Sequence, residues 1–208
     1  VVLRTFGAPH RMLVVQGTQG SGREMLLRFA AHRMGRPMLL VSGRGLDAER
    51  LVGAFREATL QGALFVLRDA EEAMTPEGRA RFRECLDVFP MPVTVMGLGD
   101  SAGWVTSLRI TTDVEVEVPP HAEREQLWRT YLSGSGGETA ISPVEWREMA
   151  GLYNLGVGGI VNACHAAREL AAGELVPVSR AHVGRAVRQL FDADLKTVAT
   201  RVEVSQNW

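Results

Sequence analysis

The chain has 208 residues, of which 46% are hydrophobic and 23% are charged, and its formal net charge at pH 7 is -1. This length suits one or two domains with a buried core, and the near-neutral charge excludes a general electrostatic reason to bind nucleic acid or an anionic membrane. Lys196 is the only lysine, so 22 of the 23 basic residues are arginines. Chemistry that needs a lysine before position 196 is therefore excluded.

The two cysteines, Cys85 and Cys164, lack the spacing of a metal site, and the five histidines form no metal motif. We therefore expect free thiols in a reducing cytosol. No apolar run approaches the ~20 residues that span a bilayer, and no signal peptide is visible, which favours a cytoplasmic protein without a membrane partner. The arginines are spread along the chain with few aromatic residues among them, which argues against a nucleic-acid site.

The first half of the chain alternates short apolar runs with amphipathic stretches. Five strands are predicted, at residues 12–16, 37–42, 63–67, 93–97 and 113–118. Helices are predicted between them, at residues 22–34, 48–60 (capped by Asp47) and 76–88. The apolar face expected for the first helix comprises Met25, Leu26, Phe29, Ala30 and Met34. This alternation predicts a parallel sheet with helices on both faces.

The pattern changes after Pro119 and Pro120, which end the fifth predicted strand. Helices are predicted at residues 122–132, from Ser142-Pro143 onward, at 159–172 and at 179–195. A flexible break is expected at 133–137. We therefore divide the chain into an α/β part at 1–119, a helical part at 120–195 and a connector at 196–208.

The loop after the first strand has the context of a phosphate-binding loop, G-x-x-x-x-G-K-[S/T]. Its eight residues are the candidate nucleotide-binding residues: Gly17, Thr18, Gln19, Gly20, Ser21, Gly22, Arg23 and Glu24. The glycines let backbone N–H groups curl around a phosphate at a helix N-terminus. Arg23 stands where the motif has its lysine, and Glu24 stands where it has the hydroxyl that holds Mg²⁺. Glu24 either opposes the polyphosphate or turns outward to solvent.

With this loop, the strand pattern and the helical second part, the chain resembles the AAA+ ATPase family over nearly its whole length. The resemblance implies a P-loop NTPase fold with a five-stranded parallel sheet of order 5-1-4-3-2 and an all-helical lid at the C-terminal end. In this family the third strand ends in Asp-Glu, which supports Mg²⁺ and polarises the attacking water. Here the natural register places Arg68 and Asp69 at these two positions, and a shift by one residue places Asp69 and Ala70 there. Neither register supplies both carboxylates. Asp69 is thus a vestigial catalytic candidate, or with Glu71 and Glu72 an ordinary acidic helix start.

The chain also matches or departs from the AAA+ pattern at other positions. Residues 119–128 resemble the proline and tryptophan-bearing start of the lid, and residues 156–163 resemble S-G-G-x-I-R-N-A. The arginine of that second stretch is Val161 here, which cannot bind phosphate. Asp100 follows the fourth strand and either orients water or caps a helix. Arg109, just before the fifth strand, is either an arginine finger or a solvated surface residue.

Departures at four positions of one constellation suggest that hydrolysis has been lost. The tail at 196–208 resembles the connector of bacterial tandem AAA+ proteins, some of which accompany contractile injection systems and carry a degenerate first domain. We therefore expect a nucleotide-sensing or structural assembly module of a larger protein-remodelling ATPase, which forms a ring of six. ATP or ADP is the expected ligand and Mg²⁺ is doubtful. Two alternatives are an active ATPase that uses Arg23 and Asp69, and a nucleotide-free protein-interaction domain.

Overall fold

The computed structural model describes residues 1–18, 20–73, 75–97, 102–134 and 139–195. Contacts divide the chain into two compact units, of which the first comprises Val1–Thr18 and Gly22–Glu117. The second comprises Gln19–Ser21 and the chain from Val118 onward. Within the described residues, no helix is long and apolar enough to cross a membrane.

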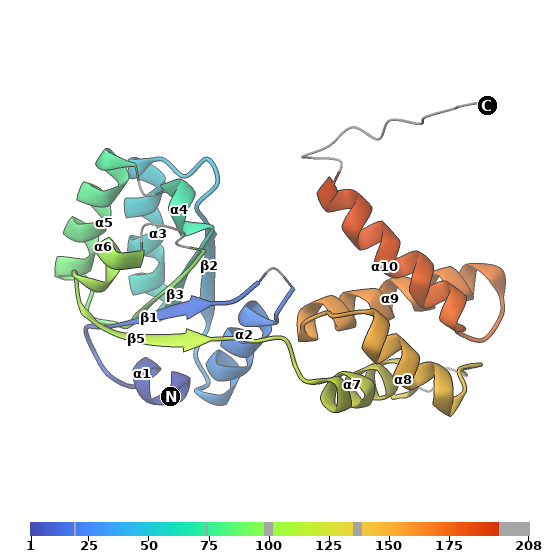
Figure 1. Cartoon of the computed structure of the whole chain (residues 1–208). Coiled ribbons are helices and arrows are strands. Elements are labelled where there is room, and N and C mark those ends of the chain that lie inside the picture. Colours follow the sequence, from blue (N-terminus) through green and yellow to red (C-terminus); the bar gives the residue numbers. More distant parts are fainter. Residues whose placement is uncertain (19, 74, 98–101, 135–138, 196–208) are drawn as a thin grey trace, which may run out of the picture. The chain divides into compact units, whose positions relative to one another are not determined.

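The first unit contains a sheet of five parallel strands (Figure 1). The strands are β1 (Arg11–Gln16), β2 (Met38–Ser42), β3 (Leu64–Arg68), β4 (Val93–Met96) and β5 (Ile110–Glu115). Their order is β2-β3-β4-β1-β5, which confirms the order 5-1-4-3-2 implied by the resemblance. The predicted fifth strand was placed three residues too late. β5 pairs with β1 from Arg11↔Ile110 to Gln16↔Glu115, so its ladder ends where β1 ends.

Helices cover both faces of the sheet (Figure 1). They are α1 (Val2–Phe6), α2 (Arg23–Arg33), α3 (Ala48–Gln61), α4 (Ala70–Ala73), α5 (Pro76–Val88) and α6 (Ala102–Thr106). Alternate residues of one strand serve the two faces: Leu64 and Val66 pack with Leu27 of α2, whereas Phe65 packs with Phe55 of α3. Burial on both sides explains why the strands are continuous apolar runs.

The predicted apolar face of α2 is wrong at two positions. Phe29 is 61% exposed and Met25 is 36% exposed, whereas Leu27, Ala30 and Ala31 are buried. Small side chains on the buried stripe let the helix lie close to the sheet, and the larger ones are left outside. The cap of α3 is confirmed, because Asp47 Oδ1 accepts a 2.7 Å hydrogen bond from the Arg50 N–H.

The second unit is helical in its described part, as expected. It contains α7 (His121–Ser133), α8 (Pro143–Leu152), α9 (Val157–Glu174) and α10 (Arg180–Leu195). These helices pack around a core that includes Trp128, Met149 and Ile160, which are fully buried. Ser142 and Glu145 form a reciprocal capping box at the start of α8. The proposed connector at 196–208 lies outside the described residues.

Candidate functional site at the carboxyl edge of the sheet

The candidate phosphate loop joins β1 to α2. Gly17, Gly20 and Gly22 have φ values of 136°, 76° and 104°, conformations that residues with a Cβ rarely adopt. Thr18 and Ser21 lie between them, and Gln19 is outside the described residues. The loop therefore has glycine where the backbone must bend, and it ends at the first residue of α2, Arg23. Open α/β sheets bind ligands at this carboxyl edge.

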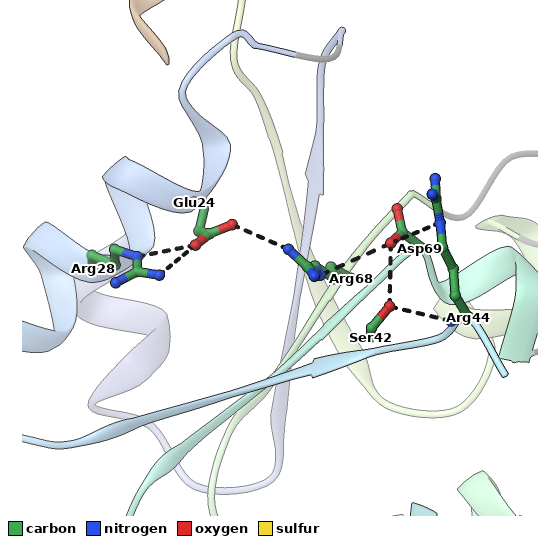
Figure 2. A network of polar contacts seen from close by, with 6 residues as sticks. All are labelled: Glu24, Arg28, Ser42, Arg44, Arg68 and Asp69. Atoms are coloured by element: carbon green, nitrogen blue, oxygen red, sulfur yellow. Dashed lines mark hydrogen bonds and ion pairs between the residues drawn. The ribbon is translucent and has the colours of Figure 1, made fainter. Parts of the chain in front are cut away.

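The Glu24 carboxylate contacts arginine side chains on two sides, so it neither points only to solvent nor stands unpaired beside the loop. Arg28, one helical turn along, donates to its Oε1 from Nε at 3.0 Å and from Nη2 at 2.6 Å. Its other oxygen, Oε2, lies 3.9 Å from Nη1 of Arg68 at the end of β3 (Figure 2). Glu24 thus occupies the space between α2 and β3 with a cation on each side.

Asp69 follows β3 and is likewise surrounded by arginine. Its Oδ2 lies 3.4 Å from Nε of Arg44 and 3.9 Å from Nε of Arg68. The Ser42 hydroxyl at the end of β2 donates to the same oxygen at 3.5 Å (Figure 2). Sequence reasoning missed Ser42 and Arg44, although Ser42 ends β2 and Arg44 follows it, and the carboxyl end of that strand meets this edge.

The backbone at this edge is closely packed around Asp69. Asp69 has a left-handed φ of 50°. A Cβ on Gly43, after β2, would lie 2.1 Å from the Asp69 carbonyl oxygen. On the other side, the carbonyl of Gly97 after β4 accepts a 2.8 Å hydrogen bond from the Glu71 N–H. The loop after β3 is therefore clamped between its two neighbours, which fixes where the Asp69 carboxylate stands.

Comparisons with known proteins bear on the fold. No family model matches the sequence, and no curated protein matches it. Among solved structures, the FIGL-1 AAA domain in complex with ADP superposes with a TM-score of 0.63 at 15% sequence identity. The match covers 93% of this chain and 80% of that one. The fold is that of an AAA domain. At this identity the likeness shows the fold alone.

Arg109 is not the solvated surface residue of the second interpretation, whereas its interpretation as an arginine finger stays a prediction. Its guanidinium donates to three backbone carbonyls: Leu86, Phe89 at 2.5 Å and Met91 at 3.2 Å. Two of these belong to the C-terminal end of α5 and its cap. Burial lowers the pKa of Arg109 from its ordinary value, but the group stays charged. Arg109 joins the end of α5 to the start of β4.

The remaining positions expected from the AAA fold add no phosphate ligand. Val161 lies half-buried on α9, and an isopropyl group has no donor. Arg124, from the proline and tryptophan-bearing segment, donates to the Ala150 carbonyl at 3.1 and 2.9 Å and to the Pro119 carbonyl at 2.5 Å. It therefore ties α7 to α8 within the second unit. Asp100 lies outside the described residues.

The residues at this edge do not suit Mg²⁺. In nucleotide sites Mg²⁺ is held by one or two protein oxygens together with phosphates and water, so the surroundings of the few carboxylates at this edge decide whether it can bind. The two carboxylates at the motif positions are already shared with arginine: Glu24 with Arg28 and Arg68, and Asp69 with Arg44 and Arg68. A guanidinium beside each of these two carboxylates repels a divalent cation.

Proposed function

We propose that this chain is an AAA-fold module that binds ADP or ATP and hydrolyses it not at all or very weakly. Its role is nucleotide sensing and assembly within a larger AAA+ ATPase that remodels proteins. Turnover then belongs to a following module, to which residues 196–208 lead, in a ring that is hexameric in the full-length protein. The ring, the second module and the cytoplasmic location rest on the resemblance of the sequence.

The observation that carries the loss of hydrolysis is the environment of Asp69. Hydrolysis needs a group that orients and polarises the attacking water, and in the unshifted register Asp69 is the residue at that position. Its Oδ2 already faces Arg44, Arg68 and Ser42, and its backbone is clamped by the ends of β2 and β4. The shifted register places Ala70 there, which has no polar group.

Nucleotide binding is supported by the loop and by Arg23. The three glycine conformations suit a backbone that wraps a phosphate. Arg23 begins α2, and among the described residues no ion pair engages it, so its charge is available to a ligand. The structural neighbour described above holds ADP on the same fold.

Phosphate release from ATP by the purified chain tests the proposal. We expect no protein-dependent release above background in the presence of Mg²⁺, together with a rise in melting temperature when ATP or ADP is added. A ligand at 100 times its Kd stabilises the state that binds it by about 2.7 kcal/mol. Release that vanishes in Arg23→Ala would instead establish an active ATPase. A melting temperature that no nucleotide moves would establish a nucleotide-free interaction domain.

A further inference from the structure

Two departures from the phosphate-loop pattern contact each other. Glu24 replaces the hydroxyl of the loop motif, and Arg68 replaces the aspartate at the end of the third strand. In the motif both positions serve one Mg²⁺ ion. Here Arg68 Nη1 lies 3.9 Å from Glu24 Oε2 across the space between α2 and β3 (Figure 2). The two changes are therefore complementary in charge, and each side chain also has a second partner: Glu24 pairs with Arg28, and Arg68 pairs with Asp69.

The ion pair also changes what Glu24 does to a bound phosphate. A free carboxylate beside the loop would repel a polyphosphate. Glu24 instead lies between two guanidinium groups, with Arg28 at 2.6 Å on the helix side and Arg68 on the sheet side. Its side chain is 36% exposed and that of Arg68 is 48% exposed, so Arg68 keeps part of its surface open toward a ligand.

The arginines at this edge offset its carboxylates, so the edge carries no net negative charge that would repel an anion. The network contains three carboxylates and three arginines. The carboxylates belong to Glu24, Asp69 and Glu72, and the arginines are Arg28, Arg44 and Arg68. Arg23 adds a fourth guanidinium at the start of α2, and Glu71 beside Glu72 adds a fourth carboxylate, so the charges at this edge balance. Arginine binds phosphate oxygens through paired N–H donors and keeps its charge at any working pH.

We propose that the chain binds the polyphosphate of a nucleotide without Mg²⁺, and that Arg68, held by Glu24, supplies the positive charge that the metal supplies in the motif. The proposal rests on the nucleotide binding proposed above. It predicts that removal of divalent cations leaves affinity intact. A site that binds ATP as a magnesium complex would lose affinity under the same treatment.

Isothermal titration of the intact chain with ATP, and separately with ADP, tests this in excess EDTA and in excess MgCl₂. For the unaltered chain we expect dissociation constants that agree within about threefold between the two buffers, well under the tenfold change that corresponds to about 1.4 kcal/mol. The double variant Glu24→Thr, Arg68→Asp restores the residue types of the motif. We expect it to bind ATP about tenfold or more tightly in MgCl₂ than in EDTA.

A matched control carries the same substitutions at another exposed ion pair of the first unit. Arg81 and Glu84 pair at 2.7 Å on α5, with 51% and 61% of their side chains exposed. Glu84→Thr, Arg81→Asp should leave binding unchanged in both buffers. Thermal melting of each variant without ligand shows that it folds. As a second variant, Arg68→Gln should weaken ATP binding in EDTA, because the polyphosphate then loses the positive charge of Arg68 and Glu24 loses its partner on the sheet side.

The possible results separate the two proposals. ATP that binds the unaltered chain only in MgCl₂ would overturn the metal-independent mode and leave nucleotide binding in place. Failure to bind in either buffer would overturn both. A double variant that folds and still binds equally well in both buffers would contradict the role assigned to Glu24 and Arg68.

Discussion

Replacing Arg109 with methionine should destabilise the first unit without any assembled ring or ligand being present. The guanidinium donates to the carbonyls of Leu86, Phe89 and Met91, and methionine keeps the length of the side chain but removes every donor. A net hydrogen bond from a charged donor is worth about 1.5–3 kcal/mol, and unpaired carbonyls add a desolvation cost. Because the site is half-buried and water can replace part of the loss, we expect about 2–4 kcal/mol in total.

The free energy of unfolding, measured by urea titration with circular dichroism, checks this value. The free energy of unfolding of Arg109→Lys should lie between those of the unaltered chain and Arg109→Met, since an ammonium group cannot reach three carbonyls in the fork geometry of arginine. The control is Arg81→Met on α5, an exposed arginine that pairs with Glu84, and it should leave the midpoint unchanged. An Arg109→Met chain with unaltered stability would refute the structural role and leave only the finger hypothesis for Arg109.

Three further predictions concern the packing of both units. Gly43→Ala should cost about 1–3 kcal/mol in urea titrations, because its Cβ would lie 2.1 Å from the Asp69 carbonyl oxygen; Gly53→Ala on α3, where nothing lies within 4 Å, should be neutral or stabilising. Ser142→Ala removes the cap of α8 and should cost about 1 kcal/mol, and a variant with unchanged stability would show that the cap contributes nothing. Burial raises the pKa of the Cys164 thiol to about 12, so the folded chain keeps a proton that the unfolded chain releases near pH 8.5. Stability from this group should be complete below about pH 8.5 and lost toward about pH 12, and Cys164→Ala should show a smaller loss across that range in urea midpoints.

The sheet could be predicted because its strands are buried on both faces. A short apolar run such as 63–67, placed between a helix and an acidic turn, fits a buried strand better than any other element. The order of the parallel strands was predicted from the resemblance to the AAA+ family. The edge strand was harder, since β5 has a partner on one side and its sequence alternates past the point where β1 stops. The orientation of α2 was also misjudged: periodicity places Phe29 and Leu26 on one stripe, but the close approach of Ala30 and Ala31 to the sheet decides which side is buried.

The sequence predicted where the candidate site lies but not which side chains contact one another there. The loop from Gly17 to Glu24 could be located because motif and context are local. The contact of Glu24 with Arg68 joins residues 44 positions apart, and nothing in either segment shows the other. The same is true of Arg109, whose carbonyl partners belong to the preceding helix and loop. Non-local pairing of this kind depends on the strand order, which brings β3 and β1 to the same edge on either side of β4.

The most direct test of the central claim is the state of a nucleotide recovered from the protein. The purified chain is incubated with ATP labelled on the γ-phosphate, separated from free nucleotide and denatured, and the released nucleotide is identified by chromatography. The account predicts ATP that is bound and intact after prolonged incubation. Recovery of ADP with labelled inorganic phosphate, or of no nucleotide at all, would contradict it.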